Sequence, residues 1–405
     1  MAADDISQAA DSGALDDVNV AAHVDVYPNI NLKDLEQEPG PSLGKRKNTF
    51  AETARSSLQR RHSTLGPKWH LDSGTVVEDV LLHAGLELTV DHPIRSFMID
   101  LQDRYTESLF SPQDWTEIKS NLPPSATYST EAAAYLDTLK DIIQEQDIIS
   151  VLESWPRDPE KAIVHGCVAS WYNLIKMDPS PFVLESILSE DWWMNNAWSG
   201  TRLLANAVPG TYIITGEATG IDSTSRRNNK ERHVNITPQN NRKRMGVRAD
   251  MIWRTVVAPV RDWMIGEAAR QWDENAGKYV QESIFKVPRQ LHDILSARSQ
   301  EVGGAHRLRK AWTTGMIFGG PVVQRMSLCW GTEGTNVTRF KRWAPARIYS
   351  SLKQLPLSLN AARQLLLVRA ETLCLIDEYD RAEQDERKEK WARSSSHDDI
   401  EDDWR

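Results

Sequence analysis

Three acidic residues lie at the ends of short apolar runs between residues 212 and 272. Glu217 follows the run YIITG, Asp250 precedes the run MIW, and Glu267 follows the run WMIG. Short runs rich in aromatic and β-branched residues are typical of strands. Acids at the ends of neighbouring strands can converge at one edge of a sheet, where their oxygens can hold a divalent metal. The sequence therefore predicts a candidate metal site built from three strands.

Each of these acids also has a simpler interpretation. Glu217 could end a strand in solvent or pair with a nearby arginine. Asp250 could be the charge that protects an edge strand. Glu267 is harder to explain in this way, because it stands in an apolar stretch and carboxylates are seldom buried unless they are paired or bound to metal. We therefore expect Glu267 to belong to a site or to a buried ion pair.

A basic insert, residues 226–248, separates the first acid from the second and carries eight basic residues against one acid. It has no apolar period, so we expect a loop or a hairpin tip there. Cations beside a metal site can grip a phosphate backbone while the acids hold the metal, although a solvated loop is the plainer alternative. The candidate nucleic-acid contacts are Arg226, Arg227, Lys230, Arg242, Lys243, Arg244 and Arg248.

A second basic stretch follows later in the chain. Lys341, Arg342 and Arg347 are interleaved with Trp343 and Tyr349. Aromatic rings that alternate with cations can bind single-stranded nucleic acid by stacking on its bases. These residues are therefore a candidate extension of the same surface.

The net charge of −9 is unevenly distributed. Residues 1–44 carry nine acids and one lysine, and residues 377–405 carry twelve acids and six bases, which leaves a net charge of +5 for the rest. The overall acidity therefore does not exclude a polyanionic partner. The three cysteines are widely spaced, which argues against a disulfide or zinc framework and favours a reducing compartment. We expect no membrane span and no signal peptide, because the apolar runs are short.

The composition divides the chain into segments. Residues 1–66 form an expected disordered arm, in which Lys45-Arg46-Lys47 and Arg60-Arg61 resemble a bipartite nuclear import signal or form an incidental basic patch. Residues 67–205 are expected to be helical, 206–355 to form an α/β core, 356–393 a long helix and 394–405 a disordered acidic tail. The expected location is nuclear or cytoplasmic, and the acidic C-terminal helix is a candidate surface for a protein partner.

Within the core, apolar patterns predict strands at 212–215, 249–257 and 263–269, followed by a helix at 279–298. Pro288 should kink this helix or mark a second start. Further strands are expected at 313–318, 322–330 and 336–343. The fold class is therefore α/β, with a central mixed sheet, an N-terminal helical region and a long C-terminal helix.

The order helix, three strands, helix, strand, with an acid on each of the three strands, resembles the PD-(D/E)xK nuclease-like superfamily. A group of uncharacterised fungal proteins within it is more similar still. The resemblance covers roughly residues 150–350. It depends on Gly216-Glu217, Ser223 to Asn228, Arg248-x-Asp250 and Gly266-Glu267-Ala268-Ala269.

This resemblance implies a restriction-endonuclease-like topology and a metal-dependent reaction. Asp250 and Glu267 would bind Mg²⁺, which orients and neutralises the scissile phosphate, and Glu217 would be the upstream acid. The superfamily places a lysine two residues after the third-strand acid, but this chain has Ala269 there. Lys286 on the following helix is the expected replacement, because a lysine or glutamine on that helix often faces the site in this superfamily.

Two functional hypotheses follow. The first is a Mg²⁺-dependent phosphodiesterase that acts on nucleic acid through Glu217, Asp250, Glu267 and Lys286. The second is a catalytically inactive nuclease-like scaffold that binds nucleic acid or a protein, and Ala269 is the reason for it. The two differ in whether the four side chains meet.

Overall fold

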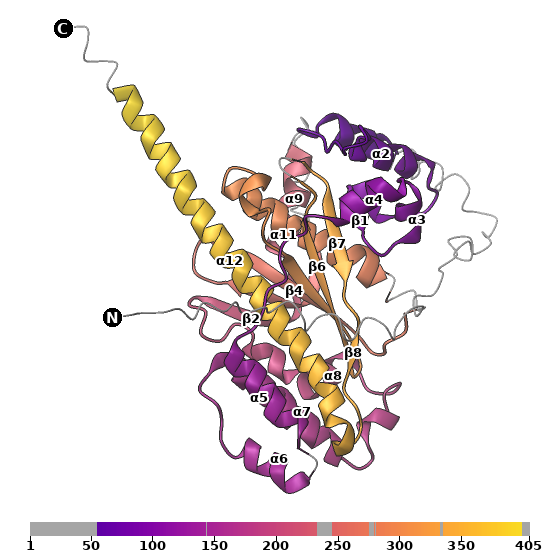
Figure 1. Ribbon diagram of the computed structural model, residues 1–405, viewed down its shortest axis with the longest axis vertical. Coiled ribbons are helices and arrows are strands. Elements are labelled where there is room, and N and C mark those ends of the chain that lie inside the picture. Colours follow the sequence, from indigo (N-terminus) through magenta and orange to yellow (C-terminus); the bar gives the residue numbers. More distant parts are fainter. Residues whose placement is uncertain are drawn as a thin grey trace, which may run out of the picture. The chain divides into compact units, whose positions relative to one another are not determined.

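The computed structural model describes residues 55–398, except 143, 233–244, 275–278, 280, 333 and 334. Within this part, eight strands form one mixed sheet in the order β1-β7-β6-β5-β4-β3-β2, and β8 pairs with β6 at one end (Figure 1). The strands are β1 (Met98–Asp100), β2 (Thr211–Thr219), β3 (Arg248–Thr255), β4 (Arg261–Ala269), β5 (Thr313–Gly319), β6 (Val322–Trp330), β7 (Thr338–Arg342) and β8 (Ala346–Arg347).

The middle of the sheet is built from two antiparallel units. β2, β3 and β4 form one meander, and β5, β6 and β7 form the other. The helix α11 (Val287–Glu301) connects β4 to β5, and these two strands are parallel. The expectation of a central mixed sheet is confirmed. β1 lies in the segment expected to be helical, yet it pairs in parallel with β7. The sequence did not predict this strand because three buried residues are too few to show a strand period.

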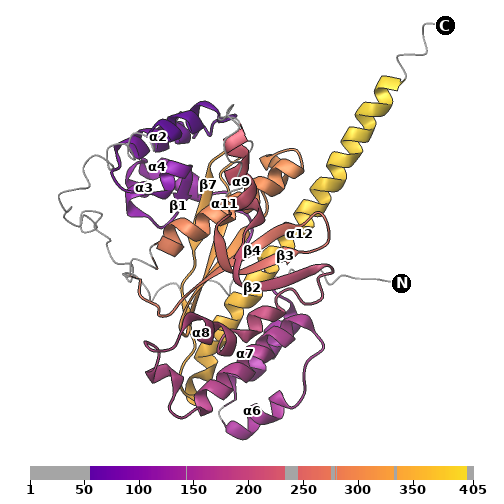
Figure 2. The same ribbon diagram turned by 180° about the vertical axis from the view of Figure 1, so that it is seen from behind.

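Helices cover both ends and both faces of the sheet. In Figures 1 and 2, α2, α3 and α4 lie at one end, and α5, α6 and α7 lie at the other. The helices are α2 (Val77–Glu87), α3 (Arg104–Ser108), α4 (Pro112–Lys119), α5 (Thr130–Lys140), α6 (Glu145–Leu152), α7 (Pro159–Lys176), α8 (Glu190–Asn196), α9 (Ile221–Arg232), α11 and α12 (Leu355–Asp398).

The first helical turns begin earlier than expected from the sequence. Residues 55–63 are helical, although they fall inside the arm that we expected to be disordered. Leu58 is buried in a small apolar core that also contains Trp69, Leu81 and Trp115. The polar composition of the segment hides this single anchoring residue, and burial of one leucine stabilises a short helix by about 2 kcal/mol.

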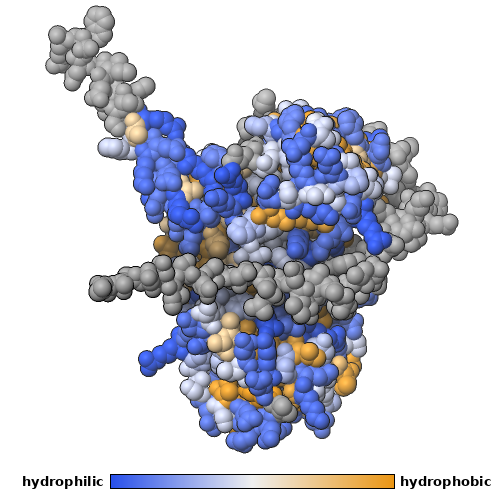
Figure 3. Space-filling model, viewed as in Figure 1, coloured by the Kyte–Doolittle hydropathy of each residue, from blue (hydrophilic) through white to orange (hydrophobic). Residues whose placement is uncertain are grey.

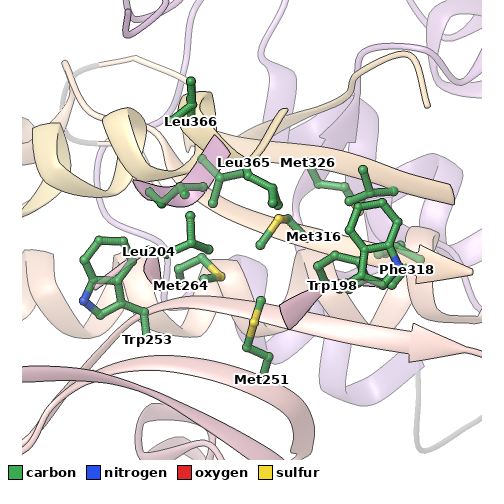
Figure 4. Packing of buried hydrophobic residues seen from close by; sticks show 14 of the residues in the cluster. Trp198, Leu204, Met251, Trp253, Met264, Met316, Phe318, Met326, Leu365 and Leu366 are labelled. Atoms are coloured by element: carbon green, nitrogen blue, oxygen red, sulfur yellow. The ribbon is translucent and has the colours of Figure 1, made fainter. Parts of the chain in front are cut away.

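The two faces of the sheet pack against different helices. Met316 of β5 pairs with Gly266 of β4 and with Arg325 of β6, so these three residues share one face. α12 covers that face, and Figure 4 shows Met316 beside Leu365 of α12. A Cβ at Gly266 would lie 2.8 Å from the end of the Met251 side chain, so the glycine leaves room for this methionine. Residues of β4 next to Gly266, such as Glu267, therefore face the opposite side, toward α11.

The helix that follows β4 starts with a wide turn. Residues Gln281–Lys286 form a π-helix, and the regular helix α11 begins at Val287 with Pro288 in its first turn. Pro288 therefore marks a restart, as one of the two expected alternatives proposed, because proline is tolerated where the first N–H groups have no helical partner. π-helical turns are common at functional sites, since the extra residue re-aims side chains.

The first part of the basic insert is a helix and not the expected loop. The Asp262 carboxylate accepts a hydrogen bond from the Ile221 N–H at 2.8 Å, and this contact caps the start of α9. Asp222 pairs with Arg298 of α11 at 2.9 Å. The sequence lacks an apolar period because tertiary polar contacts, and not a hydrophobic stripe, hold this helix in place. Residues 233–244 lie outside the described part.

The long helix α12 packs along the sheet with its first half and projects from it with its second (Figure 1). Residues 384–393 are mostly exposed, and hydrophilic side chains cover this projection (Figure 3). Ion pairs spaced four residues apart, such as Glu383–Arg387 and Glu386–Lys390, support it. Among the described helices, α12 included, a stretch both long and apolar enough to cross a bilayer is not found.

Candidate functional site

Glu267 is the centre of the candidate site. It lies near the end of β4, and its side chain is fully buried under α11. Lys286 Nζ donates to Glu267 Oε2, and Gln290 Nε2 donates to Glu267 Oε1 at 3.1 Å. The Lys286 side chain remains 30% exposed. The structure therefore brings together the third-strand acid and the helix lysine that the sequence singled out.

Asp250 lies beside Glu267 on the neighbouring strand. Met251 of β3 pairs with Gly266 of β4, so the next pair in register is Asp250 opposite Glu267, on the same face. Asp250 Oδ2 accepts a hydrogen bond from the Ala268 N–H at 2.7 Å, which fixes the carboxylate at this edge. Asp250 is only partly buried. Two carboxylates from adjacent strands thus meet where α11 begins.

The site carries more negative than positive charge. Burial raises the pKa of Glu267 to about 8, although the nearby Lys286 ammonium opposes the shift. The charges of Asp250 and Glu282 raise this pKa further. Like charges close together disfavour the ionised state of each one. With a pKa of about 8 the Glu267 carboxyl is mostly protonated at neutral pH, and a bound cation would favour its ionised form.

Sequence reasoning missed two members of this site. Glu282 is buried on the π-helical turn, and Gln290 is buried on α11. Both are four residues from Lys286, one before it and one after it. Residues four apart lie on one face of a helix, so this spacing was the available signal. This spacing alone does not distinguish buried polar residues from residues on an exposed face of the helix.

The backbone of Glu217 on β2 lies across from that of Asp250 on β3. β2 pairs with β3 at Thr215–Met251 and again at Ala218–Ala249, and a bulge lies between these pairs. Gly216 adopts a φ of 88° in the bulge, a conformation that glycine reaches without a steric penalty. Both Gly216 and Glu217 therefore stand opposite Asp250. The Glu217 side chain lies outside the described part of the structure.

The candidate nucleic-acid contacts are only partly described. Arg226 on α9 pairs with Asp293 of α11 at 2.5 Å. Arg248 is exposed at the start of β3. Arg227 and Lys230 belong to α9, but their side chains are not described, and Arg242, Lys243 and Arg244 lie in the segment left out.

The second basic stretch is engaged within the protein. Lys341 Nζ lies 3.7 Å from the centre of the Trp343 ring, and the Arg325 guanidinium lies 3.9 Å from the same ring. Arg342 pairs with Asp100 of β1 at 2.8 Å. Trp343 therefore stacks on cations of its own sheet, Lys341 from β7 and Arg325 from β6, and not on bases as expected.

A large cleft opens beside the acidic site. Its volume is about 1110 Å³, and its walls include residues 57–65, the start of α9 and one side of α11. Lys286 lines this cleft and also contacts the buried Glu267. The lysine therefore connects the carboxylates to a space large enough for a polymeric ligand.

The carboxylates of the site are of the donor type that Mg²⁺ prefers, since this ion takes oxygen ligands. Among the described residues, three or more His, Cys, Asp or Glu side chains do not gather into a metal cage. Mg²⁺ is commonly held by one or two carboxylates together with water and substrate phosphates, so the Asp250–Glu267 pair fits this ion. No protein-family model, curated protein or solved structure matches the chain.

Proposed function

We propose that the chain is a PD-(D/E)xK nuclease-like protein that hydrolyses phosphodiester bonds in nucleic acid with the help of Mg²⁺. One observation carries the proposal: Lys286, from the helix after β4, contacts Glu267 beside its cross-strand neighbour Asp250. The antiparallel β2–β3–β4 meander, followed by α11 and the parallel strand β5, supports a restriction-endonuclease-like topology.

Asp250 and Glu267 would hold the metal, and Glu217 would be the upstream acid. Bound Mg²⁺ would orient the scissile phosphate and neutralise its charge. The exposed part of Lys286 faces the cleft, where its ammonium can stabilise negative charge that develops on the phosphate. Lys286 thereby takes the role that a lysine at position 269 would have had. Gln290 keeps the Glu267 carboxylate oriented through its hydrogen bond.

Cleavage assays test this proposal directly. Labelled single- and double-stranded DNA and RNA are incubated with the purified chain in Mg²⁺, Mn²⁺ or EDTA. Cleavage should require metal, and Asp250→Asn should lower its rate by about 100-fold or more. Asp137→Asn, which changes an exposed acid on α5 that pairs with Lys140, is the matched control and should retain full activity. Intact substrates in every condition would overturn the enzyme proposal.

A catalytically inactive scaffold is the second candidate, because both oxygens of Glu267 already accept hydrogen bonds from protein side chains. Such a protein would bind nucleic acid, or a protein partner through the projecting part of α12, without cleaving anything. Titration calorimetry with Mn²⁺ separates the two candidates. The enzyme proposal predicts binding heat that Asp250→Asn abolishes, whereas the scaffold predicts none in either protein.

We also propose an intracellular location, in the nucleus or the cytoplasm. The three cysteines, Cys167, Cys329 and Cys374, are free thiols, as expected in a reducing compartment. The cluster Lys45-Arg46-Lys47 lies outside the described residues. Imaging of a fluorescent fusion with and without Ala substitutions in this cluster would distinguish the two locations.

A further inference from the structure

Three arginines from distant parts of the chain line the cleft beside the acidic site. Arg61 comes from the helical residues 55–63, Arg226 from α9 and Arg289 from α11. Their charges act on one another, since burial and the nearby Arg226 and Arg289 lower the pKa of Arg61. Guanidinium groups repel each other, so such a gathering is unfavourable unless anions balance it.

The acids in the cleft balance two of these arginines more directly than the third. Arg226 pairs with Asp293 at 2.5 Å, and Arg289 pairs with both carboxylate oxygens of Asp91 at 2.8 Å. Within the described residues, Arg61 makes a single long hydrogen bond, to Ser96 Oγ at 3.5 Å. A guanidinium has five N–H donors. Most donors of Arg61 are therefore available to a ligand in the cleft.

A purely structural arginine of the same protein has a different environment. Arg254 donates to both oxygens of Asp262, at 2.6 and 3.2 Å, and to the Thr219 carbonyl at 2.8 Å. Its donors are used within the fold. Among the residues that the structure describes, Arg61 has only the long contact with Ser96, although it is partly buried and lies in the wall of the cleft.

We propose that Arg61, with Arg226 and Arg289, forms a subsite that binds a backbone phosphate of nucleic acid in the cleft next to Lys286. Arginine suits this role because its planar fork can donate two parallel hydrogen bonds to a phosphate. The subsite rests on the proposed function, and it would position the strand so that a neighbouring phosphate reaches Lys286 and the two carboxylates.

Binding in EDTA tests the subsite without cleavage. Fluorescence anisotropy with a labelled single-stranded DNA oligonucleotide is measured over a range of salt concentrations. Arg61→Ala should weaken binding about tenfold, which is the effect of losing roughly one charge-assisted hydrogen bond. It should also lower the slope of log K against log salt by about 0.7, because one phosphate contact fewer is made. Arg61→Lys should restore part of the affinity.

Arg55→Ala is the matched control, because Arg55 is exposed on the same helical segment and is not part of the cleft wall. It should leave the affinity and the salt slope unchanged. Competition with poly-glutamate separates phosphate recognition from general attraction to anions and should be weak. Circular dichroism of each variant confirms that it is folded.

The outcomes also separate the subsite from the proposed enzyme. Unchanged binding by folded Arg61→Ala, an equal loss in Arg55→Ala, or equal competition by poly-glutamate overturns the subsite, even if the wild type cleaves DNA. Weaker binding by Arg61→Ala supports the subsite, even if no substrate is cleaved in Mg²⁺.

Discussion

Two buried acid–base pairs lie on opposite faces of the central sheet. On the face covered by α12, Glu371 accepts hydrogen bonds from Arg325 at 2.7 Å and from Ser327 at 2.8 Å. On the face covered by α11, Glu267 pairs with Lys286. Both carboxylates are fully buried, so each depends on its partner to offset the cost of desolvation. The difference between the pairs lies in their surroundings.

The Glu371–Arg325 pair is closed, and a second cation, Lys341, lies near it. The Arg325 side chain is only 3% exposed, and the Trp343 ring covers it. Burial raises the pKa of Glu371, and the neighbouring Arg325, Ser327, Thr314 and Lys341 all oppose that shift. The Glu371 carboxylate is therefore stabilised by cations and hydroxyl groups of the fold itself. This pair stabilises the packing of α12 on the sheet.

The Glu267–Lys286 pair is open and carries excess negative charge. Lys286 is 30% exposed to the cleft, and the further acids Asp250 and Glu282 raise the pKa of Glu267. Both Glu267 and Glu371 are fully buried, so burial alone does not distinguish a functional acid from a structural one. An acid is a candidate for catalysis when neighbouring acids raise its pKa and its basic partner reaches a cleft.

The largest effect is expected at the closed pair. Glu371→Ala leaves the buried Arg325 without its partner and should lower the free energy of unfolding by roughly 3–5 kcal/mol. Urea unfolding followed by circular dichroism measures this change. A loss below about 1 kcal/mol would show that the pair is not sealed, and the contrast with Glu267 would then disappear.

A smaller change in stability but a larger one in activity is expected at the open pair. Glu267→Gln removes one of the crowded negative charges and keeps an acceptor for Lys286. At pH 8 its free energy of unfolding should stay within about 1 kcal/mol of the wild type, while nuclease activity falls about 100-fold or more. The same urea and cleavage assays apply. Destabilisation as large as that of Glu371→Ala would assign Glu267 a structural role.

The effect that is smallest within any one pH unit is a difference in pH dependence. The pKa of Glu267 is about 8 in the folded chain, whereas the ordinary value of 4.5 applies to the unfolded chain. Between these values the folded state binds more protons than the unfolded state, so stability falls as the pH rises from 4.5 to 8. Relative to Glu267→Gln, the wild type should lose at most about 1.4 kcal/mol per pH unit. Parallel pH profiles of urea unfolding for the two proteins would contradict the shift.

The sequence predicted the strands of the site better than its helical side. Turn residues and β-branched runs located β3 and β4 closely enough for the strand ends to place Asp250 beside Glu267. The family resemblance pointed to Lys286, and its contact with Glu267 is present in the structure. Glu282 and Gln290 were missed because the sequence does not show that these polar residues are buried beside Glu267.

Other features depend on contacts that a local pattern does not encode. α9 has no apolar period, and ion pairs with α11 hold it in place. β1 is too short for a period and exists because β7 offers it a parallel edge. Arg61 is part of an arginine cluster only in the folded chain, where α9 and α11 bring Arg226 and Arg289 to the same cleft. Such long-range coincidences require the folded chain.

The cleft has a consequence for the timing of activity during synthesis. Its walls combine residues 57–65 with residues 281–300, which are more than 200 positions apart along the chain. Contacts of such long range form late, because the cost of closing a large loop must be met first. A nascent chain that carries Asp250 and Glu267 but ends before residue 281 has neither Lys286 nor the cleft. Trp330 and Asn336 also line the cleft, so the chain acquires its proposed activity only after more than four fifths of it has been synthesised and folded.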